Sequence, residues 1–119
     1  MIFTKKFVRP STDTDWYTPS AEFMSHIQTT YIDTGKCIRF REKTLDETGC
    51  VITILSEWVD GTDIDAVMAD PIWVTEKDRE IAWNEGSEIL LLEIKKGDEI
   101  VKTQSDELKD TYTYGMRRI

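Results

Sequence analysis

Hydrophobic residues recur along the chain with two periods, and each period predicts a different kind of element. Alternation, or a short apolar run between turn residues, predicts strands at 2–9, 36–45, 50–59 and 88–95. Recurrence every three or four residues predicts helices at 19–33, at 76–85 and in a short segment that Thr62 caps and Asp70-Pro71 ends. The order of the main elements is β-α-β-β-α-β, which is the split βαβ or ferredoxin-like arrangement of an α+β domain.

The starts and ends of the two longer helices carry local signals. Thr18 followed by Pro19 predicts a helix start, because the hydroxyl can cap the helix and proline needs no N–H there. Gly35 predicts the end of this helix. Thr75 and Asp78 resemble a capping box that opens the second helix. The apolar stripe of the first helix consists of Phe23, Met24, Ile27 and Tyr31.

The two middle strands flank a turn that ends in Gly49, and together they predict a hairpin. A three-residue loop with Gly49 in the left-handed conformation pairs Asp46 with Cys50; a slip by one residue is the alternative. We favour the first register because it separates apolar from charged residues. It places Ile38, Phe40, Ile52, Ile54 and Trp58 on one face. It places Arg39, Arg41, Lys43, Val51, Leu55 and Glu57 on the other.

The strand at 88–95 is apolar on both faces, which is typical of a strand covered on both sides. The helices of this arrangement cover one face only, so we expect a second copy of the chain to cover the other. Residues 99–103 can either pair with this strand or cross to a partner. We therefore expect a ferredoxin-like domain over 1–96 and a C-terminal extension over 97–119 that could hold an added strand and a tail.

Length and charge narrow the possible partners. A chain of 119 residues fits one domain, and its 39% hydrophobic and 32% charged residues are typical of a globular protein. The net charge of −8 disfavours nucleic acid, because phosphate binding needs a basic surface. It also disfavours an anionic membrane surface. No segment has the length of a membrane span, and the N-terminus has no signal-peptide pattern, so we expect a cytoplasmic protein.

Metal and thiol chemistry have little support in the sequence. The chain contains one histidine, His26, and two cysteines, Cys37 and Cys50, which do not form a C-x-x-C pair. A zinc site of the usual type is therefore not expected, and neither is a disulfide between the two ends of a hairpin. We predict that the protein has no metal and no cofactor.

Residues 50–71 resemble the dimeric α+β barrel superfamily, in particular its antibiotic-biosynthesis-monooxygenase-like branch. Many members have a third strand that ends in Glu-Trp, followed by a turn, a helix and a Ser-Pro-like break. The corresponding residues here are Glu57-Trp58, Val59-Asp60-Gly61, the helix from Asp63, and Asp70-Pro71.

The resemblance in topology covers residues 1–96 and implies a homodimer formed through the sheets. It also implies a cavity between the sheet and the helices, with Trp58 at its border. Haem-degrading relatives use a histidine in the later helical region, and this chain has none between residues 57 and 87. A haem site of that type is therefore not expected.

Trp58 fits two interpretations, a wall of the core or the back of a binding site. Apolar walls with few polar groups are typical of small-molecule sites. We expect a small, largely apolar ligand between sheet and helices. The expected lining residues are Trp58, Phe40, Ile27 and Met68.

Candidate catalytic groups are few. Histidine is the residue type whose reference pKa lies near neutrality. The one histidine, His26, lies beside the apolar stripe of its helix, and Tyr31 lies on that stripe. Either could transfer a proton in a cofactor-independent monooxygenase or isomerase, which is the alternative function. Arg39 and Arg41 could bind a carboxylate through both oxygens, but we favour a cross-strand ion pair between Arg39 and Glu57. A third possibility is a structural or interaction protein without a ligand.

Overall fold

The structure is a computed structural model and describes residues 1–9, 15–83, 87–103 and 117–118. The elements follow the order that the sequence predicts, including the short helix after the third strand, and the two additions are a π-helical turn and a two-residue strand near the C-terminus. They are β1 (Ile2–Val8), α1 (Ala21–Ile27), η1 (Gln28–Ile32), β2 (Cys37–Leu45), β3 (Val51–Trp58), α2 (Ile64–Met68), α3 (Pro71–Trp83), β4 (Glu88–Lys96), β5 (Glu99–Thr103) and β6 (Arg117–Arg118). The α+β class is confirmed.

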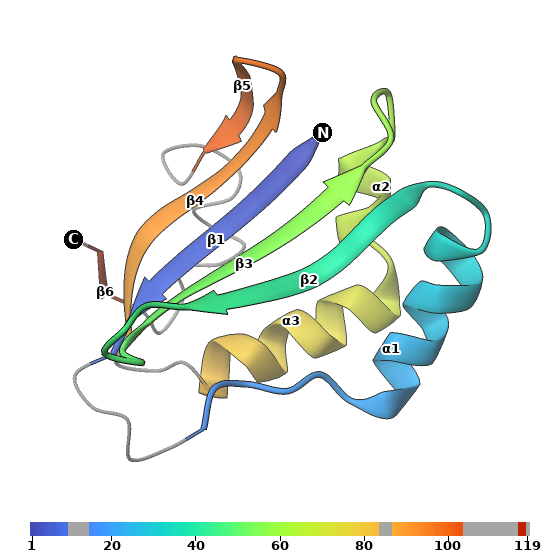
Figure 1. Ribbon diagram of the computed structural model, residues 1–119. Coiled ribbons are helices and arrows are strands. Elements are labelled where there is room, and N and C mark those ends of the chain that lie inside the picture. Colours follow the sequence, from blue (N-terminus) through green and yellow to red (C-terminus); the bar gives the residue numbers. More distant parts are fainter. Residues whose placement is uncertain (10–14, 84–86, 104–116, 119) are drawn as a thin grey trace.

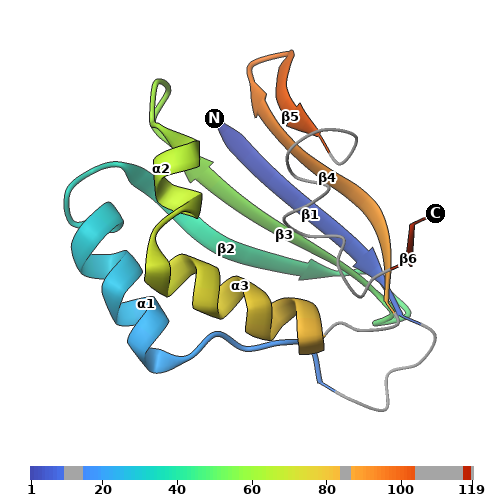
Figure 2. The same cartoon turned by 180° about the vertical axis from the view of Figure 1, so that it is seen from behind.

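The sheet has the strand order β2-β3-β1-β4-β5, and these neighbours are all antiparallel. Two-residue β6 pairs with β4 in parallel. Figures 1 and 2 show α1, α2 and α3 on the same face of the sheet. This arrangement is compatible with a ferredoxin-like fold. Of the two alternatives for residues 99–103, the structure shows pairing with β4; most of the expected tail, residues 104–119, lies outside the described residues.

Strand β3 follows the predicted alternation, whereas its partner β2 departs from it. Ile52, Ile54 and Trp58 are buried on the helix face. Near the turn, however, Leu45 pairs with Ile52, one residue away from the predicted register, because the loop is longer than three residues. Gly49 does have the left-handed conformation, with φ of 74°.

Two register shifts in β2 change the faces that we predicted for Ile38 and Arg41, whereas Phe40 packs against the core on the helix face as predicted. The shifts lie between Cys37 and Arg39 and between Arg39 and Glu42. As a result Cys37 is buried and Ile38 is 56% exposed, so the prediction for Ile38 was wrong. Arg41 has φ of 55° and its side chain lies on the helix face, so it does not share the face of Arg39 as predicted. A bulge changes the side on which the following side chains emerge, which alternation alone cannot predict.

A third irregularity lies in β4 and concerns the expected two-sided apolar strand. The pairing with β1 shifts between Lys6 and Phe7, so that Lys6 pairs with Leu91 and Phe7 pairs with Ile89. Leu90 falls in this shift and is 36% exposed. The buried residues Ile89, Leu92 and Ile94 therefore belong to the helix face, and the other face of β4 is less apolar than the sequence suggested.

The first helix starts later than predicted and changes its winding. Ser20, not Thr18, is the N-cap, and its hydroxyl accepts from the N–H of Phe23. After Ile27 the helix continues as the π-helical turn η1, in which the N–H of Asp33 donates to the carbonyl of Gln28. Phe23, Ile27 and Tyr31 are buried as expected. Met24 is 36% exposed, so the stripe is narrower than predicted.

The start of α3 was misplaced by five residues. Asp70-Pro71 begins this helix instead of only ending the previous one, because the Asp70 side chain accepts from the N–H of Ile72 and proline occupies the first helical position. Thr75 lies inside the helix, where its hydroxyl donates to the carbonyl of Pro71. Asp63, not Thr62, caps α2. The predicted end of the second helix, residues 84–85, lies outside the described residues.

The core lies between the sheet and the helices and is rich in aromatic side chains. Trp58, Phe7, Ile27, Ile52, Ile89, Leu92 and Ile94 are its largest fully buried members. Across the part of the chain that is described, no helix combines the length and the hydropathy needed to cross a membrane. The cytoplasmic location stays a prediction.

Candidate functional site

Trp58 lies at the end of β3, in the middle of a cluster of aromatic rings. Its ring makes edge-on contacts with Tyr31, Phe40 and Trp73, at centroid distances of 5.5, 6.3 and 6.2 Å. Only 1% of the residue is exposed. Trp58 is thus a core residue enclosed by three other rings, and a large share of the packing between sheet and helices depends on it.

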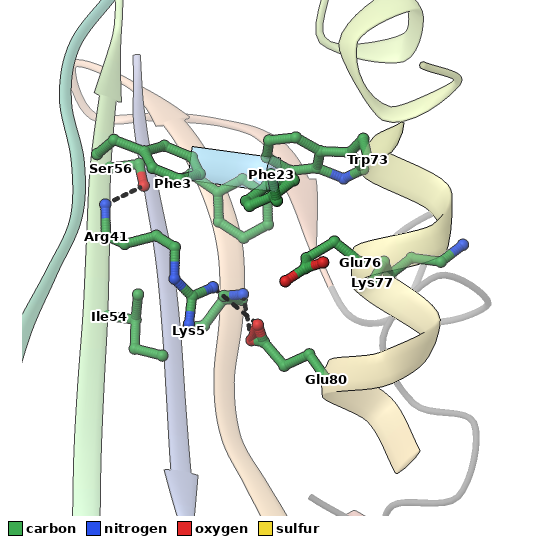
Figure 3. Close-up of a pocket in the computed structure, with 11 residues that line it drawn as sticks. Phe3, Lys5, Phe23, Arg41, Ile54, Ser56, Trp73, Glu76, Lys77 and Glu80 are labelled. Atoms are coloured by element: carbon green, nitrogen blue, oxygen red, sulfur yellow. Dashed lines mark hydrogen bonds and ion pairs between the residues drawn. The ribbon is translucent and has the colours of Figure 1, made fainter. Parts of the chain in front are cut away.

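Beside this aromatic cluster lies a buried group of three charged side chains, which we call the ionic cluster: Lys5, Arg41 and Glu80. Glu80 on α3 accepts from Nζ of Lys5 at 2.7 Å and from Nη1 of Arg41 at 2.7 Å. The side chains are 9%, 9% and 5% exposed for Lys5, Arg41 and Glu80 respectively. Figure 3 shows the two cations reaching from the sheet toward Glu80, below the rings of Phe3, Phe23 and Trp73.

Burial and mutual attraction set the charge states in the ionic cluster. Burial opposes ionisation of Glu80, but the charges and hydrogen bonds of Lys5 and Arg41 outweigh it and lower the pKa of Glu80 to about 2. Burial is also the main influence on Lys5 and lowers its pKa to about 8; Glu80 opposes this shift and Arg41 adds to it. At neutral pH the cluster therefore holds two cations and one anion.

The hydrogen bonding of Arg41 is incomplete. Its backbone N–H donates to the hydroxyl of Ser56, and its Nη1 donates to Glu80. Its Nε and Nη2 are buried without a hydrogen-bond partner. Native proteins rarely leave charged donors buried and unpaired. The left-handed backbone of Arg41 is also unfavourable for a residue with a side chain, and such conformations are frequent at functional sites.

A crevice between the sheet and α3 brings the aromatic and charged groups together. Its walls include Phe3, Phe23, Phe40 and Trp73, and its polar side includes the ionic cluster with Ser56, Glu76 and Lys77. The cavity inside has a volume of about 30 Å³. This is enough for one or two water molecules or for one small polar group.

Glu76 is buried at the rim of this crevice, where it joins α3 to the segment that precedes α1. Its carboxylate accepts from the hydroxyl of Tyr17 at 2.7 Å and from the backbone N–H of Ser20 at 2.6 Å. It also accepts from the hydroxyl of Ser20 at 3.0 Å. Burial, together with the hydrogen bond from the Tyr17 hydroxyl to Glu76, raises the pKa of Tyr17. Glu76 is thus well supplied with donors, and its role is to fix the start of α1.

The two candidate catalytic residues meet at a different place, in a second polar group that we call the Asp70 cluster: His26, Tyr31 and Asp70. One oxygen of Asp70 lies 2.6 Å from Nε2 of His26 and accepts from the hydroxyl of Tyr31 at 2.7 Å. Its other oxygen caps α3 through Ile72. Nδ1 of His26 lies 3.3 Å from the hydroxyl of Thr30.

Burial and hydrogen bonding together set the pKa values of Asp70 and Tyr31. Burial works against the charged form of Asp70, but hydrogen bonds from His26, Tyr31 and Ile72 outweigh it and lower the pKa of Asp70. Burial and the bond to Asp70 raise the pKa of Tyr31 to about 12. Tyr31 is therefore a protonated hydrogen-bond donor at neutral pH and is poorly suited to act as a base.

The structure separates the residues that the sequence grouped as a ligand site. Phe40 lines the crevice. Trp58 and Ile27 are 1% exposed within the core, and Met68 packs against the core from α2. The predicted ion pair between Arg39 and Glu57 is present at 3.0 Å and is partly exposed, so it is confirmed.

Sequence reasoning missed the main polar residues of the crevice, Lys5, Glu76 and Glu80. A signal for each was present. Lys5 lies between Phe3 and Phe7 at a spacing of two, which places it on the buried face of its strand. Glu76 and Glu80 are four residues apart, and both share the buried face of α3 with Trp73.

Within the described residues, no group of three or more histidine, cysteine or acidic side chains is arranged to hold a metal ion. Comparison of the chain with protein-family models, with curated proteins and with solved structures finds no match. The fold class therefore rests on the structure, and the function must be inferred from the geometry of the sites.

Proposed function

We propose that the protein binds a small molecule in the crevice between α3 and the sheet. The observation that carries this proposal is the incomplete ionic cluster beside an aromatic wall. A few polar groups converging in an otherwise apolar pocket are typical of ligand sites. The free volume of about 30 Å³ admits only the polar end of such a molecule, so its apolar part lies among the aromatic side chains at the mouth or displaces one of them.

A larger open groove was the other candidate for the ligand site. It has a volume of about 560 Å³ and lies between the end of η1 and the loop after β3, where Tyr31, Lys36, Val59 and Asp63 line it. Most of its lining residues are exposed, which makes it a wide surface depression. The groove lacks the converging buried donors that distinguish the crevice, so we place the ligand in the crevice.

Tryptophan fluorescence tests the position of the ligand. Trp73 lines the crevice and Trp58 does not belong to its lining, although their rings are 6.2 Å apart. A panel of small aromatic and short aliphatic compounds, neutral and charged, should contain members that shift the emission of the wild type. Trp73→Phe should lose the shift, and the matched variant Trp58→Phe should keep it. Loss of the shift only in Trp58→Phe, or no response to any compound, would contradict the proposal.

A second candidate function is proton transfer by a cofactor-independent enzyme. The Asp70 cluster favours it, because a carboxylate that orients a histidine is a common arrangement in acid–base catalysis. His26 does not line the crevice, however, so substrate would have to approach from the groove beside Tyr31. His26→Gln would then abolish turnover of a substrate identified by screening. The same variant would leave ligand binding in the crevice unchanged.

We also propose that the chain forms a homodimer through the open face of the sheet, as in the antibiotic-biosynthesis-monooxygenase-like branch of the dimeric α+β barrels. The support is the half-buried apolar side chains on that face, which include the directly paired Val8 and Val51 and, further along the same face, Leu55 and Leu91. Sedimentation should show a dimer at micromolar concentration, and Leu55→Glu should convert it into a monomer. A wild type that sediments as a monomer at that concentration would contradict the proposal.

A further inference from the structure

The structure points to a carboxylate as the polar group that enters the crevice, and we propose that Arg41 binds it. This inference rests on the proposed function and adds the chemical class of the ligand. It begins with the shape of the guanidinium group. Nε and Nη2 donate from the same edge of the planar group, and this edge matches the two oxygens of a carboxylate. In Arg41 these two atoms are the ones that are buried without a partner.

Glu80 does not fill this position. It accepts from Nη1 of Arg41 with one oxygen and from Lys5 with the other. Both oxygens of Glu80 are therefore engaged, and Nε and Nη2 of Arg41 are left buried without a hydrogen-bond partner. The carboxylate of a ligand beside Nε and Nη2 would accept from both of these donors of Arg41 at once.

The charge of the crevice also favours an anion. Of the five charged side chains that line it, three are cationic and two are anionic: Lys5, Arg41 and Lys77 against Glu76 and Glu80. Glu76 is already engaged by Tyr17 and Ser20. Lys77 is partly exposed and lies beside Asp78, but the ionic cluster alone holds two cations against one anion, with each side chain 9% exposed or less. A net positive charge away from water is costly, and an anion with good geometry reduces that cost.

Size distinguishes a carboxylate from larger anions. The free volume of about 30 Å³ suits a planar group of three heavy atoms better than a tetrahedral phosphate. Single indole N–H groups of Trp58 and Trp73 are also buried without partners. Within the described residues, Arg41 differs from them because it presents two adjacent donors and a full charge.

The neighbouring Arg39 provides a matched control. It lies two residues earlier on β2, and its Nε donates to Glu57 while its Nη1 donates to Glu42. Its side chain is 42% exposed. The two arginines thus share one strand, but the exposed Arg39 already has two carboxylate partners from the chain, whereas the buried Arg41 has two donors without a partner.

Calorimetry with benzoate and its neutral isostere benzamide tests the inference. Wild-type protein should bind benzoate at least about tenfold more tightly than benzamide, because charge-assisted bonds are the stronger ones. Arg41→Lys should remove that preference, since lysine keeps the charge but lacks the two adjacent N–H donors of the planar guanidinium group. Arg39→Lys should preserve it. Phenyl phosphate should bind more weakly than benzoate to the wild type.

The outcomes separate the two proposals. If benzoate and benzamide bind equally in the crevice and Arg41→Lys changes neither, the proposed function stands but the inference of a carboxylate ligand is wrong. That inference is also wrong if phenyl phosphate binds more tightly than benzoate. No binding of any of the three compounds at millimolar concentration would overturn both.

If Arg41→Lys does not fold, the side-chain Nε–H signal of Arg41 in the wild type gives the same answer by NMR. Benzoate should shift this signal and leave that of Arg39 in place. A shift of neither signal at saturating benzoate would overturn the inference.

Discussion

The ionic cluster and the Asp70 cluster both tie α3 to another part of the fold, but they differ in completeness. In the Asp70 cluster the carboxylate has a donor for each oxygen, from His26, Tyr31 and the start of α3. In the ionic cluster, Arg41 keeps two buried donors without a partner. The chain itself supplies a hydrogen-bond partner for each carboxylate oxygen of the Asp70 cluster, but not for every donor of the ionic cluster. This difference suggests a structural role for the Asp70 cluster and a binding role for the ionic cluster.

The largest expected effect is the loss of folding stability when Glu80 is removed from the ionic cluster. Glu80→Ala leaves Lys5 and Arg41 buried without their shared anion, and breaking a buried ion pair from one side costs about 3 to 5 kcal/mol. Unfolding in urea should show this loss. A cost of less than about 1 kcal/mol would mean that the two cations reach water in solution, and the burial of the cluster would then be wrong.

The second prediction concerns the decrease in folding stability at acidic pH. Glu80 has a pKa of about 2 in the folded chain against an ordinary value of 4.5. The unfolded chain therefore takes up the proton first as the pH falls. Stability that Glu80 contributes in full above pH 4.5 should be lost progressively toward pH 2, by an amount on the order of 3 kcal/mol.

Asp70 adds to this loss in the same direction, because its pKa is also lowered. Urea unfolding at pH 5 and pH 3 measures the combined effect. The variant Glu80→Gln should start from a lower stability and show a smaller decrease between these two pH values. An equal decrease in wild type and variant would show that Glu80 is not the group responsible.

The Asp70 cluster should give an intermediate effect. Asp70→Ala removes the cap of α3 and two side-chain hydrogen bonds, and we expect a cost of about 2 kcal/mol. Because the cluster is structural, benzoate affinity should not change. A variant that keeps its stability but loses benzoate binding would reverse the roles that we give to the two clusters.

The smallest effect is expected for His26. It is partly exposed and contributes one bond to Asp70, so His26→Gln should cost about 1 kcal/mol or less. Thermal unfolding measures it, with Asp70→Ala as the reference. A loss as large as that of Asp70→Ala would show that the histidine, rather than the helix cap, holds the cluster together.

The sequence predicted the two clusters unequally. Apolar alternation correctly placed Ile52, Ile54 and Trp58 on one face of the third strand, because sheet geometry fixes that pattern in regular strands. Helical spacing brought out His26 and Tyr31, although not their common partner: Asp70-Pro71 was interpreted as a helix end and not as a helix start.

Arg41 could not have been placed from the sequence. In regular alternation it shares a face with Arg39, and we predicted both on the side away from the helices. The irregular pairing around Arg39 and the left-handed backbone at Arg41 turn its side chain into the crevice. Such an irregularity depends on tertiary contacts, here with Ser56 and Glu80. It therefore cannot be recognised from the periodicity of apolar residues in the sequence.

A crystal structure of the protein grown with benzoate tests the central claim most directly. We predict that the carboxylate lies in the crevice with one oxygen about 3 Å from Nε and the other about 3 Å from Nη2 of Arg41, while Glu80 keeps its bonds to Arg41 and Lys5. A structure with benzoate elsewhere, and with both donors of Arg41 satisfied by the chain itself, would contradict it.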